Sequence, residues 1–165
     1  MDVPKKVILW SLVILGIFAI FRGSFIFSSA SNDPHEKITF ETADIKIASH
    51  KLKVELATSA KQHDRGLSYR EKIDPETGML FIFKRAEKPG FWMKDMNFPL
   101  DIIWLDTNRN VVYLHKNLTP DTYPQIFQSP LPIKYVLEIK AGEADKLNIK
   151  IGSHLGFKHL GFWWF

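Results

Sequence analysis

The sequence predicts a mostly β, β-barrel-like domain with two short helices, placed behind an N-terminal apolar segment. Three observations lead to this prediction. Apolar and polar residues alternate with a period of two over several stretches, as they do in half-buried strands. Turn-forming residues separate these short stretches, and the domain contains no long segment with the helical period. Several short strands combined with two short helices are typical of a closed or nearly closed barrel.

The composition is that of one domain without cysteine. The chain has 165 residues, which leaves room for little more than a single domain. The absence of cysteine excludes disulfides, cysteine nucleophiles and thiolate metal sites. Of 22 basic and 18 acidic residues, three basic and one acidic lie in residues 1–30, so the remaining 19 and 17 give a net charge of +2. These charges are dispersed, and no nucleic-acid partner is therefore expected.

The N-terminal segment is predicted to export the domain. Lys5 and Lys6 precede an apolar run, and this order places the N-terminus inside and the following chain outside. Residues 7–27 are apolar enough for a membrane anchor, whereas the small residues up to Ala30 suit a signal peptidase. Residues 1–30 are thus either a cleaved signal peptide or a retained signal anchor. Both fates make the domain extracytoplasmic, either at the cell membrane or secreted or periplasmic after cleavage near Ala30.

The rest of the chain divides into a linker, a domain and a tail. Residues 31–37 are polar and rich in turn formers, and the β-barrel-like domain is predicted over residues 38–155, followed by an aromatic tail over 156–165. Strands are expected at two stretches within 38–56 and at 78–83, 90–93, 101–106, 111–115, 133–139 and 149–155. Short helices are expected at 60–66, capped by Thr58 or Ser59, and at 141–147. Residues 107–110 should form a hairpin turn, and four prolines make residues 119–132 a long irregular loop.

Five ordered blocks of this sequence form a family pattern. The blocks are Arg-Gly-Leu-Ser-Tyr-Arg at 65–70, Gly-Met-Leu-Phe-Ile-Phe at 78–83, Phe-Trp-Met-Lys at 91–94, Pro-Leu-Asp-Ile-Ile-Trp-Leu-Asp at 99–106 and Tyr-Val-Leu-Glu-Ile-Lys-Ala-Gly at 135–142. Together they resemble the bacterial and archaeal family known as domain of unknown function 192. The resemblance covers roughly residues 52–155, and it implies a compact β-barrel-like domain with short helices, often behind an export signal. It implies no reaction. Residues 152–154 read Gly-Ser-His where members of the family often have Gly-Asp.

The densest candidate site is the block at residues 91–94, which is followed by a possible chain turn at Pro99. On a strand, Trp92 and Lys94 share one face, because successive side chains alternate. A turn at Pro99 would bring Asp101 near them, so that an aromatic platform, a cation and an anion line one concave site for a sugar, a peptide or a small zwitterion. The structural alternative is a core tryptophan with a Lys94–Asp101 pair at its rim.

A second candidate arrangement involves two carboxylates that lie within apolar strands, Asp101 and Glu138. Neighbouring carboxylates divide the acid and base roles in the hydrolysis of glycosidic bonds. In the competing structural interpretation, Arg65 at the end of the first predicted helix forms a buried ion pair with Glu138. We favour the ion pair, because buried charges need partners.

Motifs for metals, cofactors and nucleophilic catalysis are missing from the sequence. The six histidines show no ligand spacing, so no metal site is predicted. The sequence contains neither a Gly-x-Ser-x-Gly elbow nor a Gly-x-Gly phosphate loop, and no cofactor is expected.

The aromatic tail has two interpretations. Its last four residues are Phe162, Trp163, Trp164 and Phe165. They suit a membrane interface, where tryptophan is favoured, and would then join residues 7–27 as a membrane contact. Alternatively, the tail folds back over an exposed sheet edge or the mouth of the barrel.

Three functions remain open from the sequence, and whether the protein is an enzyme is one of the open points. The first is a non-catalytic extracytoplasmic, membrane-associated or secreted domain that binds a small molecule, peptide or envelope component near Trp92, Lys94 and Asp101. The second is a hydrolase of envelope polymers that uses Asp101 and Glu138. The third is a purely structural module that binds a partner at the membrane.

Overall fold

A computed structural model of the chain describes residues 38–159 and 162–163, with side chains described through residue 156. The chain contains two compact units, residues 1–36 and 37–165, and the described residues belong to the second. The predicted leader at 1–30, the linker at 31–37 and the aromatic side chains at 162–165 lie outside what the structure describes. Among the described residues, no helix has the length and apolar character needed to cross a membrane.

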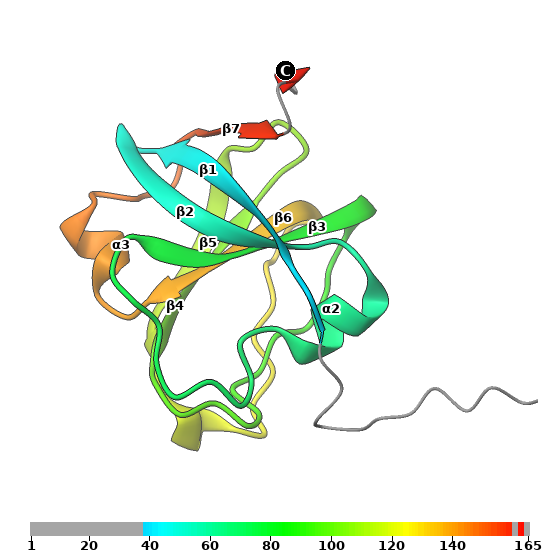
Figure 1. Cartoon of the computed structure of the whole chain (residues 1–165), viewed down its shortest axis with the longest axis vertical. Helices are drawn as coiled ribbons and strands as arrows, with labels where there is room; N and C mark the ends of the chain where they lie inside the picture. The colour runs from blue at the N-terminus through cyan, green and yellow to red at the C-terminus, as the bar shows by residue number, and fades with distance from the viewer. Residues whose placement is uncertain (1–37, 160–161, 164–165) are drawn as a thin grey trace, which may run out of the picture. The chain divides into compact units, whose positions relative to one another are not determined.

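Eight strands form one sheet that curves into a half-barrel (Figure 1). In chain order the strands are β1 Glu41–Ile47, β2 His50–Ala57, β3 Thr77–Glu87, β4 Leu100–Leu105, β5 Val111–Leu118, β6 Ile133–Lys140, β7 Leu155–His159 and β8 Phe162–Trp163. Their order in the sheet is β5-β4-β6-β3-β2-β1-β7-β8. All neighbours are antiparallel except β2 and β3, which are parallel. The mostly β class predicted from the sequence is confirmed.

Short helices connect some of the strands, and the first of these helices has a side-chain cap. Helix α2 (Ala60–Arg65) provides the crossover that the parallel pair β2–β3 requires. Ser59 caps its N-terminus and forms a reciprocal capping box with Gln62, and the helix ends at Gly66, whose φ of 49° suits glycine. Helix α3 (Glu143–Lys146) follows β6, and a 3₁₀ turn, η1 (Pro120–Thr122), lies in the proline-rich loop. Both predicted helices are present, each slightly shorter than expected.

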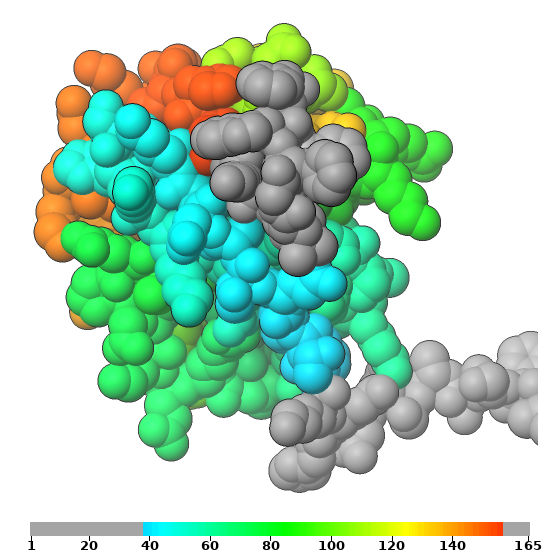
Figure 2. Space-filling view, turned by 45° about the horizontal axis from the view of Figure 1, so that its top comes forward, coloured from blue at the N-terminus to red at the C-terminus, as the bar shows by residue number. Residues whose placement is uncertain are grey.

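Backbone hydrogen bonds connect β5, at one edge of the half-barrel, to the segment that precedes β7. The backbone N–H of Val111, at the start of β5, donates to the carbonyl of Ser153 over 2.9 Å. The N–H of Leu155, at the start of β7, donates to the carbonyl of Arg109 over 2.9 Å. These bonds connect the outer strand β5 to the segment that leads into β7. Figure 2 shows the cyan residues of β1 and β2 beside the orange residues of this segment, as the antiparallel β1–β7 pairing requires.

Two expected strands differ from the structure. Residues 90–93 form no strand, because only Phe91 pairs, in an isolated antiparallel bridge with Phe127 of the proline-rich loop. The last domain strand was expected at 149–155 but begins at Leu155. The preceding residues form a turn in which the N–H of Ser153 donates to the carbonyl of Lys150 over 2.9 Å and Gly152 has a φ of 87°.

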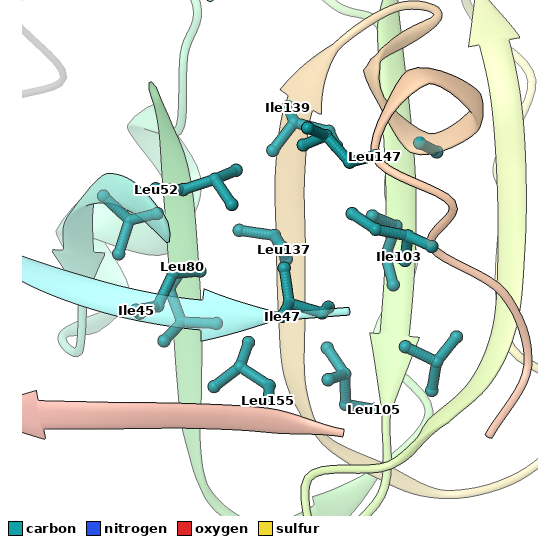
Figure 3. Packing of buried hydrophobic residues seen from close by; sticks show 14 of the residues in the cluster. Ile45, Ile47, Leu52, Leu80, Ile103, Leu105, Leu137, Ile139, Leu147 and Leu155 are labelled. Carbon is teal, nitrogen blue, oxygen red and sulfur yellow. The ribbon is translucent and has the colours of Figure 1, made fainter. Parts of the chain in front are cut away.

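The core lies on both faces of the sheet, because successive side chains of a strand point to opposite sides. On β6, Leu137 and Ile139 point to one face, while Val136 and Glu138 point to the other. The first core, shown in Figure 3, contains Ile45, Ile47, Leu52, Leu80, Ile103, Leu105, Leu137, Ile139, Leu147 and Leu155. The second core contains Met79, Phe81, Phe83, Phe91, Met93, Ile102, Trp104, Phe127 and Val136.

Gly78 permits the close approach of β3 and β6 that positions Glu138. A Cβ at residue 78 would lie 2.4 Å from the Glu138 carbonyl oxygen and 3.0 Å from Ile139 Cγ2. We expect Gly78→Ala to lower the free energy of unfolding by roughly 1–3 kcal/mol, because the backbone must shift to relieve the overlap. Urea unfolding measures this loss. Gly156→Ala is the matched control, since its Cβ would meet only the Lys46 carbonyl oxygen, at 4.0 Å. Equal losses in both variants would contradict the expectation.

Candidate functional site

A pocket opens on the side of the second core, between α2 with the turn that follows it, the strand β3 and residues 89–92. Its volume is about 260 Å³, just below the range of roughly 300–1,000 Å³ for drug-sized ligands. Four aromatic side chains line it: Phe81, Phe83, Phe91 and Trp92. The polar side chains of the lining are His63, Asp64, Arg65, Ser68 and Glu138. We call this cavity the Glu138 pocket.

Glu138 is the buried acid of this pocket. It comes from the middle of β6, where Met79 of β3 and Ile102 of β4 are its cross-strand partners. The residue is 5% exposed, and its carboxyl forms no hydrogen bond or ion pair with any described residue. Burial raises its pKa from 4.5 to about 8, and the charge of Arg70 opposes the rise only in part. At neutral pH, this carboxyl therefore mostly keeps its proton.

Arg65, which lines the pocket, and Arg70, whose charge lowers the pKa of Glu138, each contact another side chain. The Arg65 guanidinium lies over the ring of Tyr69, 5.4 Å from its centroid. Tyr69 is held in place by its hydroxyl, which donates to the Asp95 carboxylate over 2.7 Å. Arg70 donates through both terminal nitrogens to the carboxylate of Glu55. Arg65 and Glu138 thus line the same pocket, but the ion pair predicted between them does not form among the described contacts.

Trp92 and Lys94 take different positions at this site. Trp92 lines the Glu138 pocket and is 51% exposed. Lys94 is exposed and does not line the pocket, and its carbonyl accepts a hydrogen bond from the Ser68 hydroxyl over 2.9 Å. The alternation expected from the sequence is present, because Phe91 and Met93 are buried whereas Trp92 and Lys94 are exposed. It is present without a regular strand.

Asp101 lies away from the pocket and binds the backbone. It is fully buried in β4, where Oδ1 accepts the N–H of Asn117 over 2.8 Å and Oδ2 accepts the N–H of Ala144 over 2.9 Å. Its cross-strand partner in β6 is Ile139, whereas Glu138 pairs with Ile102. Asp101 and Glu138 consequently point to opposite faces of the sheet. The expected grouping of Trp92, Lys94 and Asp101, and the expected carboxylate pair, are not brought together by the fold.

His63 is a pocket residue that sequence reasoning missed. Its Nε2 lies 2.9 Å from the Ala57 carbonyl oxygen, and because a carbonyl only accepts, Nε2 carries the hydrogen and donates it. The ring packs against Phe83 with centroids 4.7 Å apart. The available signal was its place in the last turn of the predicted helix, three residues before Gly66. From that position the ring points toward β3, where it contacts Phe83.

The described residues show no group suited to hold a metal ion. Within them, no three histidine or carboxylate side chains gather closely enough for that role. The candidate site is therefore a pocket with one buried acid and aromatic walls, and we consider its chemistry on that basis.

Comparisons with known proteins give a family and two similar structures. The model of the DUF192 family, described as "Uncharacterized ACR", matches residues 42–157. One similar crystal structure is that of a protein from Sinorhizobium meliloti 1021, provisionally assigned as a transcription regulator. It has 32% sequence identity to this chain and a TM-score of 0.70, and the match covers 73% of this chain and 97% of the other. A crystal structure of a protein of unknown function from Novosphingobium aromaticivorans DSM 12444 has 28% sequence identity and a TM-score of 0.64, and the match covers 74% of this chain and 88% of the other. No curated protein matches the chain.

Proposed function

The chain belongs to the DUF192 family, and since the description of that family assigns no activity, we propose from the pocket that the domain binds a small molecule without converting it. The observation that supports this proposal is the buried Glu138 carboxyl without a partner at an aromatic-lined cavity. A buried ionisable group without a partner costs stability. Such groups are concentrated at functional sites, where a ligand supplies the missing interaction.

Binding fits this site better than the hydrolysis expected from Asp101 and Glu138. Hydrolysis of a glycosidic bond normally needs two carboxyl groups that face the same bond. The expected second carboxyl, Asp101, faces the other side of the sheet and is occupied by two backbone N–H groups. The aromatic walls supply contact area for a ligand and no nucleophile.

The place where the domain would act is proposed from the sequence. The two lysines and the apolar run within residues 1–30 support export, followed by either retention at the membrane or cleavage near Ala30. The aromatic residues at 162–165 would add a contact with the same membrane. According to this proposal, the pocket binds small molecules or envelope components outside the cytoplasm.

Trp92→Ala tests the proposal. We expect compounds from a library of small polar and charged molecules to raise the melting temperature of the full-length chain. Trp92→Ala should weaken their binding at least about tenfold, because it removes one wall of the pocket. The variant itself should unfold at nearly the wild-type temperature, since Trp92 is half exposed. Thermal shift identifies the compounds, and calorimetric titration gives their affinities.

Leu131→Ala is the matched control for this test. Leu131 is 53% exposed and does not line the pocket, so the substitution removes similar exposed apolar surface elsewhere. Compounds that bind Leu131→Ala as they bind wild type, but not Trp92→Ala, support the proposal. If no compound stabilises the chain, or if Trp92→Ala leaves every affinity unchanged, the proposal fails.

A further inference from the structure

We infer that the ligand of the Glu138 pocket is a small organic cation, namely an amine whose ammonium group binds the Glu138 carboxylate and whose hydrocarbon part contacts the aromatic walls. This inference rests on the proposed function, because it assigns the ligand class of the same pocket. Three properties of the pocket lead to it. Glu138 has no ion-pair partner among the described residues, the walls are aromatic, and the polar groups of Ser68 and His63 are already hydrogen-bonded.

The partner that the Glu138 carboxylate lacks is a positively charged group. The neighbouring strands place only Met79 and Ile102 opposite it. The charged or titratable groups on the α2 side of the lining are His63, Asp64 and Arg65. Arg65 lies over Tyr69, and Arg70, which is not part of the lining, is bound to Glu55. Among the described residues, no cation forms an ion pair with Glu138, and a ligand cation would supply that partner.

The walls of the pocket favour a cation over an anion. Aromatic faces carry negative electrostatic potential and attract ammonium groups within about 6 Å. Phe81 and Phe91 pack edge to face with centroids 5.1 Å apart, and Trp92 adds a half-exposed indole at the same pocket. An anion would lie against the same negative ring faces and beside the acid. The walls and the acid thus select for the same sign of ligand charge.

Two polar groups of the pocket are already hydrogen-bonded and are not free for a polyhydroxylated ligand. The Ser68 hydroxyl already donates to the Lys94 carbonyl over 2.9 Å, and His63 Nε2 donates to the Ala57 carbonyl. A sugar needs several directed hydrogen bonds, because each hydroxyl buried without one costs free energy. An ammonium group on a hydrocarbon body needs one strong acceptor and apolar walls, which is what the lining offers.

Binding of such a cation should release a proton. Burial raises the Glu138 pKa to about 8, so the empty pocket at pH 7 mostly holds the neutral acid. The ammonium group binds the ionised carboxylate, and the displaced proton passes to the buffer. No covalent bond of the ligand forms or breaks. Affinity should therefore increase about tenfold per pH unit from pH 6 to 7 and level off above pH 8.

Calorimetric titration of the full-length chain with three matched probes tests the inference. The probes are benzylammonium, benzyl alcohol and benzoate, which share one ring and differ in charge. Titrations at pH 6, 7 and 8, each in two buffers with different ionisation enthalpies, measure affinity and proton release together. We expect benzylammonium to bind at least about tenfold more tightly than the other two. Close to one proton should be released at pH 6 to 7.

Two variants connect these results to Glu138. Glu138→Gln keeps the shape of the protonated acid but cannot ionise, so benzylammonium affinity should fall at least about tenfold and proton release should disappear. Glu71→Gln removes an exposed carboxylate outside the pocket and should behave as wild type. The pH profile and proton count of the wild-type chain provide evidence that does not depend on folding of either variant.

The outcomes separate this inference from the proposed function. Binding of benzyl alcohol or benzoate as tight as that of benzylammonium, or a benzylammonium affinity independent of pH, would overturn the inference. So would an absence of benzylammonium binding. If a neutral or anionic compound then binds and Trp92→Ala removes its binding, the pocket proposal stands and only the ligand class is wrong. If no probe or library compound depends on Trp92, both fail.

Discussion

Asp101→Ala is expected to lower the free energy of unfolding by about 2–5 kcal/mol, the largest single loss among the substitutions considered. The carboxylate is fully buried and accepts two backbone hydrogen bonds, from Asn117 and Ala144. These bonds join β4 to the end of β5 and to the first turn of α3. Asn117 also has a positive φ of 55°, which its hydrogen bond to Asp101 helps to hold. Alanine leaves both N–H groups without this acceptor, and the N–H of Ala144 lies in a buried place that water reaches poorly.

Two further variants make this expectation specific. Asp101→Asn keeps one acceptor oxygen but turns an NH₂ group toward the other N–H donor, so a loss between those of wild type and Asp101→Ala is expected. Asp106→Ala is the matched control, because Asp106 also accepts two backbone hydrogen bonds, from Asn108 and Asn110, but lies in a half-exposed turn. Water replaces the lost bonds there, and the cost should stay near 1 kcal/mol. Urea unfolding that shows equal losses for Asp101→Ala and Asp106→Ala would contradict this account.

The second large effect is a loss of stability with rising pH that depends on Glu138. Its pKa is about 8 in the folded chain, against the ordinary value of 4.5 that holds when the chain is unfolded. Between these values the folded state keeps a proton that the unfolded state has released, so raising the pH favours unfolding. The free energy of unfolding should fall by up to about 1.4 kcal/mol per pH unit in this window. Above about pH 8 the folded state also loses the proton, and the decline from this group ends.

Glu138→Gln should remove this contribution. The variant should have a free energy of unfolding close to that of wild type at pH 5 and exceed it by a few kcal/mol at pH 9, because glutamine never carries the buried charge. Urea unfolding at several pH values measures the difference. Glu71→Gln, at an exposed position, should keep the wild-type slope. Parallel curves for wild type and Glu138→Gln across pH 5 to 9 would contradict the expectation.

The structure shows that the local elements were largely predictable from the sequence. The capping box of Ser59 and Gln62, and the stop at Gly66, define α2 because their hydrogen bonds lie within one helical turn. The alternation in β1 and β2, and the turn between β4 and β5, likewise reflect side chains near each other in the chain. Family membership was predictable too, because short ordered blocks carry it.

Other elements depend on partners far along the chain. The strand expected at residues 90–93 is replaced by a single bridge between Phe91 and Phe127, because no neighbouring strand is available there. The parallel pairing of β2 with β3 follows from the α2 crossover, which alternation alone does not reveal. The late start of β7 depends on the hydrogen bonds that tie residues 152–155 to β5. Backbone pairing over such separations is not encoded in any local window.

The candidate site divides in the same way. The sequence by itself singled out Trp92, Arg65 and Glu138, and all three line one pocket. The residue types were informative because an aromatic ring beside charged groups, and an acid within an apolar strand, are unusual in any fold.

The tertiary structure alone decided which of the selected residues meet. Every side chain of β4 is buried, so its pattern of apolar residues does not reveal which face Asp101 occupies. Its register with β6 decides this, and it turns Asp101 toward Ile139 and away from Glu138. The sequence by itself thus determined a mostly β domain with two short helices and an acid within an apolar strand. Only the packing of strands distant in the chain placed that acid, without a partner, against aromatic walls.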